Sequence, residues 1–262
     1  MRIIVAKDYS MMSKIASRMI ETEIKKNPRA ILGLATGSTP VGAYKKLIDA
    51  YKKGLDFSKV TVFNLDEYYG LAPSHEQSYA YFMRENLFNH INIDISKTYI
   101  PDGMTKNPKI ECRKYDQLVR ESGGIDLQLL GIGENGHIGF NEPSEELQID
   151  THLVELTHTT VSANSRFFES VDDVPRQAIT MGLGSIMKAD KIILLASGEN
   201  KSKIIAKTIE GKVSTSTPSS LLQLHPKVTL IIDQEISNYL KIKNLWRENI
   251  QDKDVYHTSI GF

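Results

Sequence analysis

The sequence lacks the cysteines needed for a disulfide and an excess of charge of either sign. Cys112 is the single cysteine among 262 residues, so no disulfide can form within the chain. Lys and Arg together number 32, as do Asp and Glu, which gives a formal net charge of zero. A nucleic-acid-binding protein needs a basic excess to neutralise phosphates, so this balance argues against that class. A zero net charge is still compatible with a few local basic residues that bind a small anion.

Long apolar runs are also missing. Residues 1–6 are mostly apolar but turn polar at Lys7, which makes them too short for the core of a signal peptide. No later stretch approaches the length of a membrane span. Hydrophobic residues make up 40% and charged residues 24%, as in ordinary globular proteins. With no disulfide and no targeting segment, we expect a cytoplasmic protein without a membrane partner.

Short β-rich runs alternate with longer amphipathic segments. Strands are predicted at residues 2–6, 30–35, 60–65, 126–130, 191–196 and 227–232, and helices at 11–25, 41–52, 108–122 and 201–209. Strands that are continuous apolar runs are buried on both faces, which indicates a parallel sheet covered by helices. We therefore predict an open α/β fold with its sites at the carboxyl ends of strands.

No repeat or composition shift marks a domain boundary, so residues 1–262 are predicted to form a single domain. Residues 143–174 are polar, rich in Ser and Thr, and weakly periodic. Such a segment is either a long surface excursion or a lid over a site, and we favour the lid.

The first candidate site joins a predicted strand to a helix in the run GLATGSTP, residues 33–40. Small residues such as Gly37 let backbone N–H groups converge on an anion, and the following helix presents its positive end. Ser38 and Thr39 add hydroxyl donors. No Gly-Lys-Ser/Thr follows, which argues against a nucleoside-triphosphatase. A tight turn with a Ser/Thr cap is an equally good interpretation of these residues alone.

Two adjacent acids, Asp66 and Glu67, follow the strand predicted at residues 60–65. Enzymes with α/β folds usually place their chemistry at this end of a strand. Adjacent side chains tend to point in different directions, so one acid could face a ligand while the other is structural. The alternative is that both cap or solvate a turn.

The third candidate is the loop LGIGENGHIGFNEP, residues 130–143. Its first three glycines spell a dinucleotide fingerprint, but Gly139 and Pro143 interrupt any following helix, so we reject that interpretation. A histidine such as His137 can shuttle protons near neutral pH beside a carboxylate such as Glu134 or Glu142. A hydrogen-bonded structural histidine remains the alternative. The spacing contains no paired-histidine motif, and no metal site is predicted.

Two isolated cations lie beside small polar residues: Arg166 in NSRFF, residues 164–168, and Lys201 in GENK, residues 198–201. Arginine offers a bidentate fork to a phosphate, and lysine at a strand–helix junction offers a point charge. Either could equally be a solvated surface group.

Together these segments closely resemble the glucosamine-6-phosphate deaminase family, also called glucosamine-6-phosphate isomerase. The matching stretches run in family order and span nearly the whole chain: residues 33–40, 63–70 with 78–79, 131–143, 156–158, 163–168 and 222–227. The resemblance implies a Rossmann-like three-layer α/β/α fold with a mainly parallel central sheet. It also implies a cofactor-free reaction of amino-sugar catabolism, which converts glucosamine 6-phosphate and water to fructose 6-phosphate and ammonia.

The resemblance implies a role for each candidate residue. Asp66 would be the base that takes the C2 proton, and His137 with Glu142 would open the pyranose ring. The phosphate of the substrate would lie on Gly37, Ser38, Thr39, Arg166 and Lys201.

Two departures from the family pattern matter. Many members have Asp where this chain has Asn135; an amide cannot accept a proton at neutral pH, so Asn135 is expected to orient His137 or the substrate. Allosteric hexameric members bind an activator phosphate through basic residues at positions that correspond to His152 and Val154. Val154 cannot donate a hydrogen bond, so we expect no activation by N-acetylglucosamine 6-phosphate, and a monomer or small homo-oligomer.

Two other functions share part of this pattern. A 6-phosphogluconolactonase shares the fold and the phosphate turn, but it hydrolyses a lactone and has no need of an enolising base, so Asp66 with Glu67 argues against it. The other is a sugar-phosphate sensor without catalysis. No helix-turn-helix segment or basic arm precedes the α/β core, and the acid–base set is nearly complete, which argues against that class.

Overall fold

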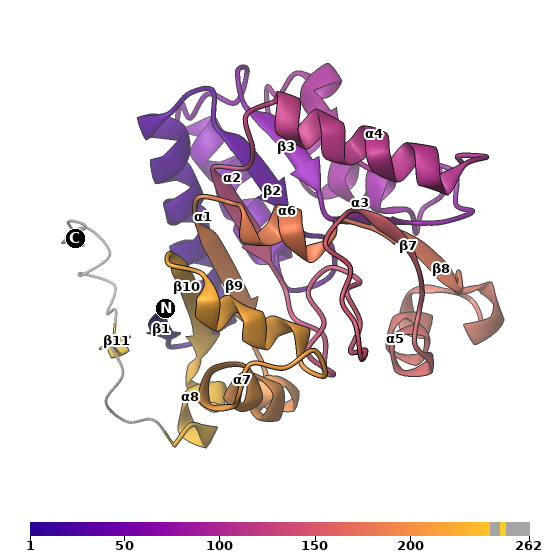
Figure 1. Cartoon of the computed structure of the whole chain (residues 1–262). Coiled ribbons are helices and arrows are strands. Elements are labelled where there is room, and N and C mark those ends of the chain that lie inside the picture. The colour runs from indigo at the N-terminus through magenta and orange to yellow at the C-terminus, as the bar shows by residue number, and fades with distance from the viewer. Residues whose placement is uncertain (242–246, 250–262) are drawn as a thin grey trace.

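The computed structural model describes residues 1–241 and 247–249, and its largest element is a parallel β-sheet (Figure 1). The strands are β1 (Arg2–Ala6), β2 (Ile31–Leu34), β3 (Thr61–Asn64), β5 (Thr98–Tyr99), β6 (Leu127–Leu130), β9 (Ile192–Ala196), β10 (Val228–Asp233) and β11 (Arg247–Asn249). Their order is β11-β1-β10-β9-β6-β2-β3-β5, and each neighbouring pair is parallel.

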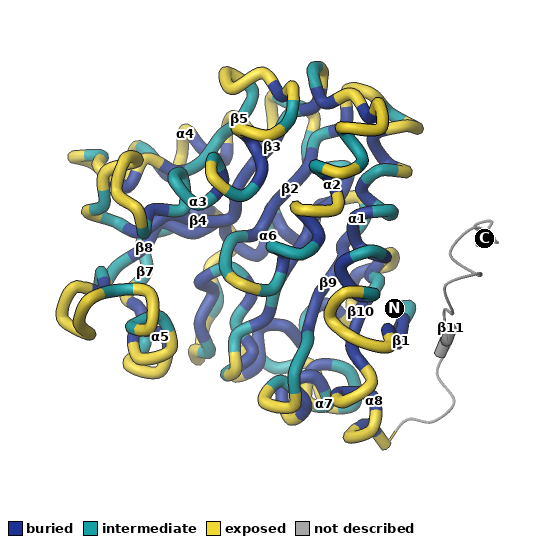
Figure 2. Tube along the Cα trace, turned by 180° about the vertical axis from the view of Figure 1, so that it is seen from behind, coloured by how far each residue is buried: buried dark blue, intermediate teal, exposed yellow. Residues whose placement is uncertain are grey.

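Helices cover both faces of this sheet. One face carries α1 (Tyr9–Lys26), α2 (Val41–Lys52) and α3 (Tyr79–Asn86), and the other carries α4 (Pro108–Glu121), α6 (Leu183–Met187), α7 (Ser202–Glu210) and α8 (Gln234–Tyr239). Because successive strand side chains point to opposite faces, Ile4 belongs to the cluster under α1 while Ile3 and Val5 belong to the cluster under α7. Most residues of β1, β2, β3, β6, β9 and β10 are accordingly buried (Figure 2). The predicted three-layer α/β/α fold is confirmed.

A second, antiparallel sheet lies beside the first. It consists of β4 (Asp66–Tyr68), β8 (Gln177–Thr180) and β7 (His152–Glu155), in that order. The chain continues from β7 into α5 (His158–Asn164), η3 (Ser165–Phe167) and η4 (Val171–Asp173), which lie at the periphery of the molecule (Figure 1). This sheet was not predicted. It gives the segment 143–174 regular structure, while movement of that segment as a lid remains a prediction.

The first residues of α1 and α4 are explained by the chemistry of helix N-termini. Helix α1 begins at Tyr9, two residues before the predicted start, because the Asp8 side chain accepts a hydrogen bond from the Met11 amide. Helix α4 begins at the predicted Pro108, where proline is favoured because its missing N–H would be unpaired anyway.

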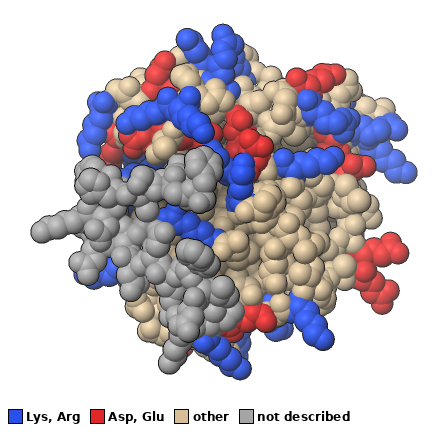
Figure 3. Space-filling view, turned by 60° about the vertical axis from the view of Figure 1, so that its left-hand side comes forward, with Lys and Arg blue, Asp and Glu red and all other residues tan. Residues whose placement is uncertain are grey.

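The surface carries both signs of charge. On the face shown in Figure 3, basic and acidic side chains are interspersed, in keeping with the zero net charge. Among the helices of the described residues, none combines the length and the apolar character that a membrane crossing requires.

Candidate active site

The main sheet reverses its strand order between β2 and β6. From β2 the order runs outward to β3 and β5, and from β6 it runs the other way to β9 and β10. Ligands of open α/β proteins bind at such a point, beyond the carboxyl ends of the strands. A cleft of about 790 Å³ lies there, lined by the loops after β2, β3, β6 and β9 and by the α5–η3 segment. This volume is typical of a small-molecule site.

The cleft collects the residues predicted from the sequence. Eight of the nine line it: Gly37, Ser38, Thr39, Asp66, Asn135, His137, Arg166 and Lys201. The ninth, Glu142, is 8% exposed and contacts His137 instead. Five stretches of chain, the first and last more than 160 residues apart, therefore meet in one place.

The turn after β2 combines a glycine in the left-handed region with a helix N-terminus that no side chain caps. Gly37 has φ +90°, in the left-handed region that favours glycine. Helix α2 follows with Pro40 as its N-cap and no side-chain cap, so its positive end is available to a ligand. Tyr9 holds the turn: its hydroxyl donates to the Ser38 carbonyl at 3.1 Å and accepts from the Gly42 amide at 2.8 Å. Tyr9 was missed because no local pattern connects residues so distant in sequence.

Two cations line the same cleft from different elements. Burial lowers the pKa of Lys201; Glu134 opposes this shift, and the nearby charge of Arg166 adds to it. The Arg166 guanidinium lies 4.7 Å from the centre of the Phe167 ring. Asn200 Nδ2 donates to Glu134 Oε1 at 2.6 Å, which ties the loop after β9 to the loop after β6. A bound phosphate would relieve the repulsion between the two cations.

Asp66 is the buried acid of the cleft. It begins β4 and is 5% exposed. Burial raises its pKa to about 8, with a smaller contribution from the charge of Glu67, and no hydrogen bond from the described residues offsets the shift. A general base is most effective when its pKa lies near the working pH. This carboxyl group is therefore suited to proton transfer.

Glu67 has a different role. Its carboxylate accepts hydrogen bonds from the amides of Tyr68 at 2.8 Å, Tyr79 at 2.9 Å and Ala80 at 2.9 Å. Burial raises its pKa to about 7, and these three hydrogen bonds oppose the shift. Two of the donors open helix α3, so Glu67 anchors that helix beneath the cleft. The pair thus divides into one acid in the cleft and one structural acid.

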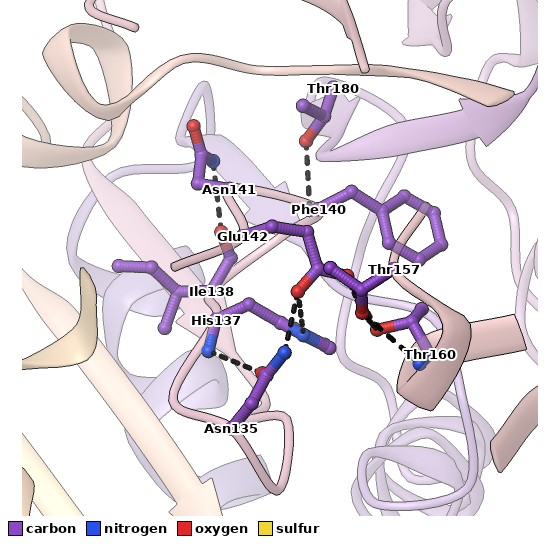
Figure 4. A network of polar contacts seen from close by, with 9 residues as sticks. All are labelled: Asn135, His137, Ile138, Phe140, Asn141, Glu142, Thr157, Thr160 and Thr180. Carbon is purple, nitrogen blue, oxygen red and sulfur yellow. Dashed lines mark hydrogen bonds and ion pairs between the residues drawn. The ribbon is translucent and has the colours of Figure 1, made fainter. Parts of the chain in front are cut away.

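Asn135 connects His137 with Glu142 (Figure 4). Its Oδ1 accepts from the His137 amide at 3.2 Å, and its Nδ2 donates to Glu142 Oε2 at 2.6 Å. His137 Nδ1 lies 3.3 Å from the same carboxylate oxygen, within ion-pair distance but without the direction of a hydrogen bond. The amide therefore contacts both partners, and it cannot itself accept a proton at neutral pH.

Glu142 is held in its charged form. Burial by itself would raise its pKa, but contacts with His137, Thr160 and Asn135 outweigh burial and lower the pKa to about 2. Glu142 thus remains a carboxylate at neutral pH, with its Oε2 atom 3.3 Å from His137 Nδ1.

Two threonines complete this network and were not identified from the sequence. The hydroxyl of Thr160 makes a short hydrogen bond to Glu142 Oε1, and that of Thr157 lies 3.3 Å from the same oxygen (Figure 4). Thr157 is also the N-cap of α5, a pattern visible in the sequence, but its partner Glu142 lies 15 residues earlier.

Gly133 makes room for the histidine ring. A Cβ at this position would lie 2.3 to 2.5 Å from three atoms of the His137 imidazole, closer than any real contact. The glycine is needed for this close approach, not for a dinucleotide.

The part of the chain that the structure describes contains no group of three or more His, Cys, Asp or Glu side chains that could hold a metal ion. His152 and Val154, which the resemblance places at the family's activator site, lie on β7 and do not line the cleft. Val154 packs against the apolar cluster beside α5, and His152 Nδ1 lies 2.9 Å from the Asp150 carbonyl.

Comparisons with known proteins agree with this geometry. The profile of the family described as glucosamine-6-phosphate isomerases/6-phosphogluconolactonase matches residues 9–231. The glucosamine-6-phosphate deaminase of Clostridium perfringens (strain 13 / Type A) is 56% identical over 242 residues, which cover 92% of this chain and 100% of the relative. That of Halothermothrix orenii is 56% identical over 241 residues, with the same coverage.

Solved structures show the same likeness. A monomeric glucosamine-6-phosphate deaminase superposes with a TM-score of 0.89 at 43% identity, covering 91% of this chain and 100% of that one. A 6-phosphogluconolactonase from Trypanosoma cruzi superposes with a TM-score of 0.75 at 20% identity, covering 92% and 97%. At 20% identity, the similarity to this lactonase shows only that the two chains share a fold.

Proposed function

The chain belongs to the glucosamine-6-phosphate isomerase/6-phosphogluconolactonase family, and from this membership and the cleft we propose that it is a glucosamine-6-phosphate deaminase. It converts glucosamine 6-phosphate and water to fructose 6-phosphate and ammonia. The observation that carries the proposal is Asp66, a buried carboxyl group with a raised pKa, in one cleft with an anion-binding turn and a histidine.

The phosphate of the substrate binds at the end of the cleft formed by the turn after β2. Backbone amides around Gly37 and the hydroxyls of Ser38 and Thr39 donate to it, and Arg166 and Lys201 neutralise its charge. The main contribution of this phosphate site is positioning, because a fixed phosphate places the sugar carbons at set distances from the acid–base groups.

His137 catalyses the opening of the pyranose ring. A proton has to leave the C1 hydroxyl and reach the ring oxygen, and an imidazole can do both near neutral pH. Glu142, ionised through its contacts, stabilises the imidazolium that forms in between. Asn135 orients the pair.

Asp66 then removes the proton from C2 of the open aldehyde. The enolamine that forms takes a proton at C1, which leaves an iminium group at C2. Water adds to C2 and ammonia departs, so one water is consumed for each ammonia released. General acid–base steps of this kind contribute roughly 10²- to 10⁴-fold each.

The 6-phosphogluconolactonase alternative needs no base for a carbon acid. Among the described residues none donates a hydrogen bond to the buried Asp66 carboxyl group, which is a costly arrangement that a lactonase does not need and an enolising enzyme uses as its base. We further expect the protein to act in the cytoplasm, with its sugar-phosphate substrate, as a monomer or small homo-oligomer.

A coupled assay tests the proposal. The purified protein is incubated with glucosamine 6-phosphate, and ammonia and fructose 6-phosphate are measured separately. Equal amounts of both products are expected. Hydrolysis of 6-phosphogluconolactone without ammonia from the amino sugar would assign the chain to the lactonase activity, and binding of the amino sugar without any product would assign it to a sensor.

A further inference from the structure

One short segment reaches two different parts of the cleft. Helix α5 provides Thr160, whose hydroxyl contacts Glu142, and the η3 turn that continues from α5 provides Arg166 at the phosphate end. Arg166 lies six positions after Thr160 in the sequence. The α5–η3 segment therefore contributes both to the proposed phosphate site and to the contacts of the Glu142 carboxylate.

The contact to Glu142 is buried and well defined. Thr160 is 4% exposed and Glu142 is 8% exposed. The Thr160 hydroxyl donates to Glu142 Oε1 and can accept from the Thr157 hydroxyl at 3.1 Å. Hydrogen bonds to buried charges are among the stronger ones in proteins. The other carboxylate oxygen, Oε2, faces Asn135 and His137, so both oxygens of the Glu142 carboxylate have partners (Figure 4).

Helix α5 is fixed to the body of the protein independently of this bond. Val161 and Leu156 pack into the apolar cluster with Tyr68 and Phe140, and Thr157 caps the helix through the Thr160 amide. Removing the Thr160 hydroxyl should leave the helix, and Arg166 at its end, in place.

We propose that Thr160 is a positioning residue for ring opening: its hydroxyl fixes the Glu142 carboxylate beside His137 and ties that pair to the α5–η3 segment, which also carries Arg166. The inference rests on the proposed deaminase function.

The test compares three variants with the wild type in the ammonia assay. Thr160→Val keeps the shape of the side chain and removes the donor, and Thr160→Ser keeps the donor. Thr208→Val is the matched control, because Thr208 is a buried helical threonine, hydrogen-bonded to the Ile204 carbonyl and outside the cleft. Unfolding temperature is measured for all of them.

Thr160→Val is expected to lower kcat by roughly 10- to 100-fold, since a hydrogen bond to a buried charge is lost, with KM within about threefold of the wild type. Thr160→Ser should restore kcat to within about threefold, and Thr208→Val should keep kcat while lowering stability. An equal effect on KM and kcat in Thr160→Val, an unchanged kcat, or a failure of serine to rescue would overturn the positioning role. An inactive wild type would remove the deaminase function itself and the inference with it, so the two failures are distinguishable.

Discussion

Replacing Asp66 by asparagine should remove activity and, above neutral pH, make the protein more stable. The folded protein holds this carboxyl group at a pKa of about 8, against an ordinary value of 3.8. Between these values the folded protein keeps a proton that the unfolded chain has released. The free energy of unfolding of the wild type therefore falls as the pH rises from about 4 to about 8.

The magnitude follows from the size of the shift. Each unit of pKa corresponds to about 1.4 kcal/mol, so the wild type loses about 6 kcal/mol across this range through Asp66. Asparagine does not titrate, but its buried amide lacks partners and costs about 1–3 kcal/mol at every pH. Asp66→Asn should thus be less stable than the wild type by about 2 kcal/mol near pH 4 and more stable by about 4 kcal/mol near pH 9.

Urea unfolding followed by circular dichroism at pH 4.5, 6, 7.5 and 9 measures this difference. The matched control is Asp190→Asn, because Asp190 is exposed; its effect should stay within about 0.5 kcal/mol at every pH. A difference between Asp66→Asn and the wild type that does not change with pH would refute the claim that Asp66 is held against its ordinary ionisation. The same variant should lose roughly 10²- to 10⁴-fold in kcat.

Four further outcomes are expected. Asn135→Asp should retain measurable activity with an altered pH profile, because it brings a second negative charge to the carboxylate of Glu142; complete loss of turnover in a folded variant would contradict this. Gly133→Ala should cost about 10²-fold in kcat by displacing the His137 ring, and a crystal structure with an unmoved ring would argue otherwise. Arg166→Lys should raise KM about tenfold by losing the bidentate fork, and an unchanged KM would place the phosphate elsewhere. The substrate curve should be hyperbolic and insensitive to N-acetylglucosamine 6-phosphate; a sigmoidal curve relieved by that compound would show that activation persists.

The main sheet could be predicted because its strands carry their own signal. Strands such as β9 and β10 are apolar on both faces, and the helices between them have helical spacing. The small antiparallel sheet had no such signal. Strand β4 reads Asp-Glu-Tyr and β7 reads His-Leu-Val-Glu, and both owe their structure to pairing with β8. The strand conformation of these segments depends on tertiary pairing, as is often the case for short polar strands.

The site divides in the same way. The strand-end loops could be located because glycine clusters and adjacent acids follow buried strands, and the family resemblance assigned roles to them. The contacts of Thr160 and Tyr9 could not be predicted, because each joins residues 18 or more positions apart through side-chain hydrogen bonds. The single-domain prediction includes residues 242–246 and 250–262, which lie outside the described residues.

The central claim is that the carboxyl group of Asp66 moves the C2 proton of a sugar held by its phosphate. Exchange of that proton with solvent deuterium, followed by NMR on glucosamine 6-phosphate, tests it most directly. We predict that wild-type enzyme exchanges the C2 proton during turnover, and that Asp66→Asn binds inorganic phosphate with unchanged affinity yet exchanges at least about 10²-fold more slowly. Exchange at the wild-type rate in Asp66→Asn would contradict the account.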